Sequence, residues 1–160
     1  MRQLIFTVTI TSCMLMFVGC GGRNLPKDLP PLYRQSIVIT QDGEPFANVS
    51  VGVIPVDESK WNAAGATDAN GVAEMYTHGL YRGVAAGKHK VTLSKQMTET
   101  KFLGFKRDGE EVVEETVYSP FALKYLDSKT TPLEIEVSKK NAKVTFDVGP
   151  AVRVVIPRDQ

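Results

Sequence analysis

The sequence predicts an all-β protein, and three observations lead to that fold class. Hydrophobic and polar residues alternate in several short segments, as they do in half-buried strands. Turn pairs such as Asp42-Gly43 and Asn70-Gly71 separate these segments. From Tyr33 onward, no segment shows the spacing of an amphipathic helix. About eight or nine short strands with turns at close spacing favour a β-sandwich.

The strands are expected where the alternation is clear. His89, Val91 and Leu93 share one face of the segment 87–94, and Leu133, Ile135 and Val137 share one face of 133–138. Residues 101–105 and 111–118 flank Arg107-Asp108-Gly109 and are expected to form a projecting hairpin. The remaining expected strands cover residues 36–40, 49–55, 72–77, 144–148 and 152–156, with 61–67 as a further candidate.

Charge and cysteine content exclude several classes of function. Arg2 is one of 19 basic residues and precedes Cys20, so 18 basic residues remain against 18 acidic ones beyond it. A neutral domain has no field to attract a polyanion, so nucleic acid is not expected as a partner. The two cysteines, Cys13 and Cys20, both lie near the N-terminus. The domain therefore contains neither a disulfide nor a thiolate metal site.

The first 20 residues have the pattern of an export signal. Arg2 precedes an apolar stretch from Leu4 to Val18, which is short for a membrane-spanning helix. Phe17-Val18-Gly19-Cys20 resembles the lipobox of bacterial lipoproteins. The resemblance implies cleavage before Cys20, a diacylglyceryl thioether on its sulfur, and anchoring to membrane lipid. An ordinary cleaved signal and an uncleaved helix with an incidental cysteine are the alternatives.

Three regions follow from this pattern. Residues 1–19 are the signal peptide, residues 20–32 are the lipidated Cys20 and a tether rich in glycine and proline, and residues 33–157 are the β-sandwich domain. The lipobox implies a lipid-anchored position in the cell envelope. The residue after Cys20 is Gly21 and not an aspartate. In the lipoproteins that this pattern resembles, the residue at this position influences which membrane receives the protein, so the resemblance implies the outer membrane if the cell has two membranes.

Three segments of the domain resemble carboxypeptidase-regulatory-like domains, which have a transthyretin-like fold. Residues 42–49 resemble their opening motif D-G-x-P-x-x-x-V, and residues 67–71 resemble their T-D-x-N/D-G turn. Residues 83–93 resemble a strand motif of the family, with Ala86 and His89 where proline and tyrosine are usual. The resemblance implies a single Greek-key β-sandwich. Backbone preferences for turns and strand starts explain the residues of each motif, and no motif supplies a catalytic group.

Few side chains qualify as functional. The two histidines, His78 and His89, are expected in a loop and in a strand, so catalytic residues, a bound metal and a cofactor are not expected. Asp68 and Asn70 fit a turn better than a calcium loop. Trp61 follows a loop-like stretch and is a candidate for stacking on a ligand. The acidic residues 110, 111, 114 and 115 lie opposite Lys101, Lys106 and Arg107 and are expected to pair across the hairpin.

These observations predict an anchored module for binding or structure that is not an enzyme. The expected partners are membrane lipid, through acylated Cys20, and an envelope protein or glycan. One alternative is a lipid-anchored hydrolase or metal-dependent enzyme that uses His78 and His89. Another is an accessory subunit of an envelope transport or polysaccharide assembly system that uses the hairpin.

Overall fold

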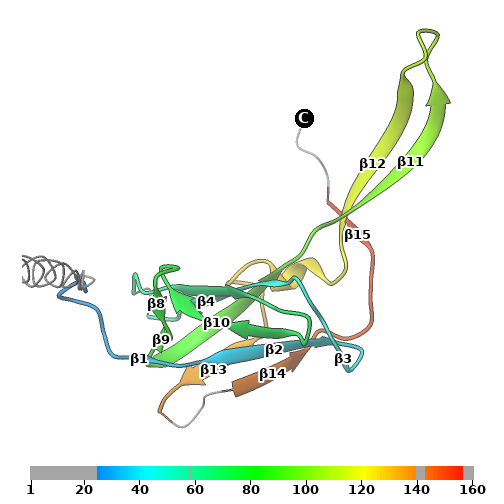
Figure 1. Ribbon diagram of the computed structural model, residues 1–160. Coiled ribbons are helices and arrows are strands. Elements are labelled where there is room, and N and C mark those ends of the chain that lie inside the picture. The colour runs from blue at the N-terminus through cyan, green and yellow to red at the C-terminus, as the bar shows by residue number, and fades with distance from the viewer. Residues whose placement is uncertain (1–24, 58, 140–142, 157–160) are drawn as a thin grey trace, which may run out of the picture.

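The computed structural model of the protein describes residues 25–57, 59–139 and 143–156. These residues form fifteen strands and one short 3-10 helix, so the predicted all-β class is confirmed (Figure 1). The predicted signal peptide 1–19 and the predicted lipidation site Cys20 lie outside the described residues. Within the described ranges, no helix has the length and apolar character needed to cross a membrane.

The strands are short, and two of the longest form a hairpin. Their bounds are β1 Leu32–Tyr33, β2 Ser36–Gln41, β3 Glu44–Pro45, β4 Ser50–Pro55, β5 Ala63–Ala66, β6 Val72–Glu74, β7 Tyr76–Thr77, β8 Tyr81–Arg82, β9 Val84–Ala85, β10 Gly87–Ser94, β11 Met97–Phe105, β12 Glu111–Ser119, β13 Glu134–Val137, β14 Lys143–Asp147 and β15 Val154–Val155; the 3-10 helix η1 is Leu123–Tyr125.

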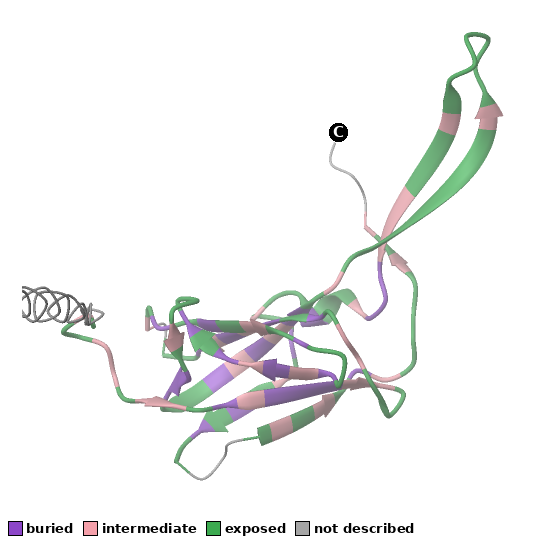
Figure 2. Ribbon diagram, viewed as in Figure 1, coloured by how far each residue is buried: buried purple, intermediate pink, exposed green. Residues whose placement is uncertain are grey.

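Two sheets enclose the core. The larger sheet has six strands in the order β13-β10-β4-β5-β7-β8, and each neighbouring pair is antiparallel. The second sheet contains β14, β2 and β3, with β6 also pairing with β2. β14 runs parallel to β2. In Figure 1, β2 and β14 lie below β4 and β10, and Figure 2 shows buried residues along β2, β4 and β10.

Alternation explains which side chains form this core. In β4 and β10, Val53 lies opposite Val91 and Val51 lies opposite Leu93, and all four are buried. Full burial of each such side chain contributes about 1.5–3 kcal/mol. The expected inward face of 87–94 is therefore confirmed. The core cluster consists of residues 37, 39, 49, 51, 53, 63, 73, 75, 84, 91, 93, 121, 125, 135, 137 and 148.

The segment 72–77, expected as one strand, is two strands in different sheets. β6 pairs with β2, whereas β7 pairs with β5. Met75 lies between them, is fully buried, and donates its backbone N–H to the carbonyl of Gln35 at 3.2 Å. The chain therefore crosses from one sheet to the other at Met75. This crossing, together with the unpredicted strands β1, β3, β8 and β9, explains why the described strands outnumber those expected.

The tether and the domain meet one residue earlier than expected. Leu32, the final residue of the predicted tether, lies in β1 opposite Ala85. Asp28 forms an ion pair with Lys60, and this contact lowers the pKa of the Asp28 carboxyl. Part of the predicted tether is thus held against the body.

Both predicted turns are present. Asp42 and Gly43 have φ values of 56° and 81°, as a two-residue hairpin of type I′ requires, and they join β2 to β3. The carboxylate of Asp147 accepts hydrogen bonds from Thr40 Oγ1 at 2.8 Å and from the Gly43 N–H at 2.8 Å. Asp147 therefore joins the end of β14 to the turn that follows β2.

Candidate functional site

The hairpin formed by β11 and β12 is the candidate functional site. It projects away from the sandwich, as predicted for residues 101–118, and Figure 2 shows most of it exposed. Phe102 and Phe105 have exposed fractions of 54% and 66%. Met97, Leu103 and Val113 are exposed as well. Among the described residues, the core cluster includes none from 97–118, so these apolar side chains do not serve the core.

A β-bulge groups the apolar side chains on one face. Phe102 pairs with Val113 and Gly104 pairs with Val112, so Leu103 is the extra residue in β11. The extra residue returns Phe105 to the face of Phe102, and the two rings make an edge-to-face contact with centroids 5.1 Å apart. Phe102, Phe105 and Val113 therefore form a small apolar patch, which we call the hairpin patch.

The base of the hairpin is fixed to the body. β15 pairs with β12 on the side away from β11, with Val155 opposite Tyr118. Ser119 is fully buried and donates its hydroxyl to the carbonyl of Phe121 at 2.7 Å. Arg153 lies over the ring of Tyr118 and forms an ion pair with Glu99. These contacts give the hairpin a defined direction.

Part of the expected charge pairing across the hairpin is present, although Glu111 lies opposite Phe105. Lys101 lies opposite Glu114 in the strand register. Lys106 forms an ion pair with Glu110 at 2.5 Å across the tip. The hairpin has six acidic residues and three basic ones between positions 97 and 119, so its net charge is negative.

Trp61 is not the exposed aromatic residue that its candidate role requires. Only 8% of its surface is exposed. Its ring stacks on His78, with centroids 5.0 Å apart and planes 24° apart, and the Lys60 ammonium lies 5.0 Å from the ring centroid. The indole of this ligand candidate therefore packs against the side chain of His78.

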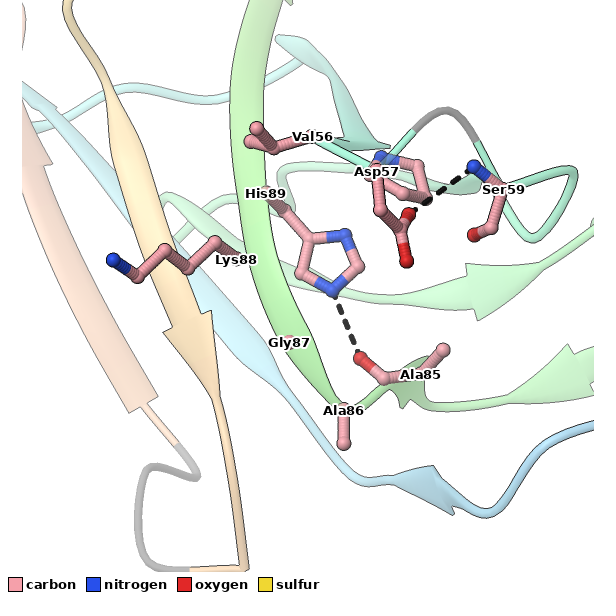
Figure 3. Close-up of a pocket in the computed structure, with 9 residues that line it drawn as sticks. Val56, Asp57, Ser59, Ala85, Ala86, Gly87, Lys88 and His89 are labelled. Atoms are coloured by element: carbon pink, nitrogen blue, oxygen red, sulfur yellow. Dashed lines mark hydrogen bonds between the residues drawn. The ribbon is translucent and has the colours of Figure 1, made fainter.

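His89 faces a pocket of about 280 Å³ at the end of β4 and the start of β10. It is 1% exposed, and its Nε2 lies 2.9 Å from the carbonyl of Ala85. Because a carbonyl only accepts, Nε2 carries the proton. Burial lowers the pKa of His89, although the Ala85 hydrogen bond and the Asp57 charge oppose the shift. Nδ1 is buried without a hydrogen-bond partner in the described chain, on the side of the ring that faces Asp57 (Figure 3).

The structure does not bring the two histidines together. His78 has a positive φ of 50°, lies in the expected loop, and bonds through Nε2 to the carbonyl of Lys60 at 2.6 Å. It is absent from the lining of the His89 pocket. The described residues contain no group of three histidine, cysteine, aspartate or glutamate side chains that could hold a metal ion.

Asp68 forms the expected turn. Its Oδ1 accepts hydrogen bonds from the backbone N–H groups of Asn70 and Val72, both at 2.9 Å. The Val72 bond is the main cause that lowers the pKa of the Asp68 carboxyl. The Asp68 carboxylate therefore stabilises the turn by accepting these two backbone hydrogen bonds.

Comparison with known proteins gives one similar structure. No family model matches the chain, and no curated protein matches it. The crystal structure of BcpA, the major pilin subunit of Bacillus cereus, is similar over 73% of this chain, with 15% sequence identity and a TM-score of 0.40. The match covers 29% of the pilin chain, so this chain spans less than a third of its length. This similarity is too low to carry a functional argument.

Proposed function

We propose that the protein is a cell-envelope lipoprotein whose β domain is a non-catalytic binding or structural module. Acylated Cys20 anchors it to membrane lipid, in the outer membrane if the cell has two membranes. The domain presents the β11–β12 hairpin to a protein partner. The lipobox-like residues 17–20 support the anchor, and the exposed hairpin patch supports the partner.

The position of the hairpin fits this proposal. In Figure 1 the described chain enters the body from the left, through the segment that precedes β1, whereas the hairpin projects at the upper right. An anchor attached before Leu25 leaves the hairpin on the far side of the body from the tether. A partner in the envelope can therefore reach the hairpin without meeting the attachment point.

The hairpin patch is the observation that carries the proposal. A hairpin that only connects two strands needs no exposed phenylalanine, and burying a side chain of this size stabilises a complex by about 1.5–3 kcal/mol. Contacts between aromatic and aliphatic side chains favour a protein partner over a glycan. The burial of Trp61 removes the aromatic side chain considered for stacking on a sugar.

The geometry of the histidines supports the non-catalytic part of the proposal. A nucleophile needs a base within hydrogen-bond reach. His89 is nearly inaccessible and bonds to Ala85, whereas His78 stacks on Trp61 in a different part of the structure. Neither histidine lies beside the hairpin patch.

Replacing Cys20 tests the anchor. We expect Cys20→Ser to move the protein from the membrane fraction to the soluble fraction of its native envelope, and Cys13→Ser to leave it in the membrane. Mass spectrometry of the wild-type protein should find acyl chains on Cys20. Membrane retention of the Cys20→Ser protein would contradict a lipid anchor.

Replacing the two phenylalanines tests the partner. We expect Phe102→Ser/Phe105→Ser to lose proteins that co-purify with the wild type from the envelope. Leu80→Ser is the matched control, because Leu80 is 59% exposed but lies outside the hairpin. It should keep the same proteins. An identical set of co-purified proteins in all three samples, together with an unchanged native mass of the protein itself, would refute a role for the hairpin.

A further inference from the structure

Among the residues that the structure describes, no strand pairs with the outer side of β11. The strand order of this sheet is β11-β12-β15, so β12 is paired on both sides and β11 on one side only. β11 spans nine residues, Met97–Phe105, and contains no proline. Long, exposed edge strands with apolar side chains readily pair with another strand.

We infer that β11 pairs with β11 of a second copy of this chain, with Thr100 on the two-fold axis. This inference rests on the proposed function of the hairpin as a binding surface and names the partner. The two hairpins would form one antiparallel four-stranded sheet in the order β12-β11-β11-β12. A two-fold contact of this kind is isologous, so each contact occurs twice.

Symmetry limits the possible registers. Residues opposite each other in an antiparallel pair point to the same face of the sheet, whereas consecutive residues of one strand point to opposite faces. Two copies of β11 related by a two-fold axis can meet this condition only if one residue lies opposite its own copy. The axis therefore passes beside that residue and not between two residues. An axis at Glu99 places Glu99 opposite its own copy, and an axis at Lys101 does the same for Lys101. An axis at Thr100 places Glu99 opposite Lys101 of the second copy, twice. Charge complementarity therefore selects Thr100 from these three central positions.

The neighbouring strands extend this complementarity. Glu99 is ion-paired with Arg153, and Lys101 lies opposite Glu114. The partner of Glu99 in β12 is Thr116, so across the two copies the row on this face becomes Thr116, Glu99, Lys101 and Glu114, with the last two from the second copy. Lys101 then lies between two glutamates. Such a row favours one register over its neighbours.

The other face of the sheet carries Phe102, together with Thr98, Thr100 and Glu115. Phe102 lies beside Val113 in its own hairpin, and Thr98 lies opposite Val117. In the Thr100 register, Phe102 would lie opposite Thr98 of the second copy. The row then reads Val113, Phe102, Thr98 and Val117, with the last two from the second copy. Pairing would thereby cover Phe102, which is more than half exposed in the single chain.

A disulfide at residue 100 tests this register. Opposite residues of antiparallel strands have Cα atoms about 4.5–5.5 Å apart, within the range for a disulfide. Thr100→Cys in the membrane-anchored full chain should therefore give a covalent dimer under mild oxidation. Thr98→Cys is the matched control: in this register its two copies lie about 13 Å apart along the strands, too far for a disulfide. The wild-type protein, oxidised in the same way, measures any crosslinking through Cys13 and Cys20.

An exchange of charges tests whether the contact between Glu99 and Lys101 of the second copy selects the register. Glu99→Lys in the Thr100→Cys background places lysine opposite lysine and should lower the crosslinked fraction severalfold. Adding Lys101→Glu restores opposite signs between the copies and should recover part of the crosslinking. The recovery is partial because the two exchanges place like charges beside Arg153 and Glu114 within each hairpin. Crosslinking of Thr98→Cys as strong as that of Thr100→Cys would overturn the register, and absence of crosslinking at both positions would overturn the pairing. If the phenylalanine variant still loses its co-purified protein in that case, the proposed function stands and only the identity of the partner changes.

Discussion

Two turn glycines with the same backbone conformation have different surroundings. Gly71 has a φ of +72° and Gly79 a φ of +68°, a region that side chains other than glycine rarely adopt. A Cβ added at Gly71 would lie 2.5 Å from the carbonyl oxygen of Ile39 and 3.0 Å from the backbone nitrogen of Phe46. At Gly79 it would meet nothing within 4 Å. The two positions therefore separate the effect of backbone conformation from the effect of close packing.

We expect Gly71→Ala to destabilise the domain more than Gly79→Ala. The left-handed conformation alone costs about 1–2 kcal/mol, and this cost applies to both variants. Gly71→Ala adds a backbone clash and should lower the free energy of unfolding by about 2 kcal/mol more. Urea denaturation of the two variants measures the difference, and equal losses would contradict the close approach of the turn to β2.

The sequence predicts the turn at Gly71 but not the close approach of this turn to Ile39. Asn70-Gly71 indicates a positive φ because of local backbone preferences alone. The approach of Gly71 to Ile39 depends on how β2 and β6 pair, which is a long-range contact. For the same reason the sequence could not place Trp61. Its burial depends on a loop that folds against His78.

Among the elements, strands that stay in one sheet were predicted well. The segment 87–94 alternates along its whole length, and β10 has the same bounds. The segment 72–77 was not predicted as two strands, because a buried Met75 fits a continuous pattern as well as a crossing. The hairpin was predicted from Asp108-Gly109, but its patch was not. Phe102 and Phe105 are three residues apart and break the alternation, which is the signal of the bulge.

The hairpin should be removable without unfolding the sandwich. We expect replacement of residues 101–114 by Asn-Gly, which joins Thr100 to Glu115 by a two-residue turn, to change the free energy of unfolding by at most about 1 kcal/mol. The removed side chains lie outside the core cluster of the described residues, and the base contacts of Tyr118 and Ser119 remain. Thermal and urea unfolding measure the effect. A loss of several kcal/mol would mean that the hairpin stabilises the body.

At the scale of the whole molecule, stability should fall in two stages as pH falls. Burial lowers the pKa of His89 below its ordinary value of 6.5. Between 6.5 and that lower value, the unfolded chain binds a proton at His89 and the folded chain does not. Stability therefore decreases as pH falls through this window and is fully present above it.

The second stage comes from carboxyl groups with lowered pKa values. Hydrogen bonds from Ser36 and Arg82 lower the pKa of Glu74, and those from Thr40, Gly149 and Gly43 lower that of Asp147. The contribution of these two carboxylates to stability is present above their ordinary pKa values, 4.5 for Glu74 and 3.8 for Asp147. It is lost as the pH falls below those values. His89→Gln should remove the first stage and keep the second. Urea denaturation at a series of pH values measures both stages. If the stability of the variant fell with pH just below 6.5 as steeply as that of the wild type, the role of His89 would be contradicted.

The parallel pairing of β2 with β14 also determines when the domain can close during its synthesis. Thr40 donates its hydroxyl to Asp147, which lies 107 positions later in the chain. Because the N-terminal part of a chain emerges first, one side of β2 stays open until β14 has been made. On the proposed route of export, this delay is an advantage. A chain that cannot complete its sandwich before β14 is made remains incompletely folded until then, and a chain that has not finished folding is easier to thread through a membrane channel.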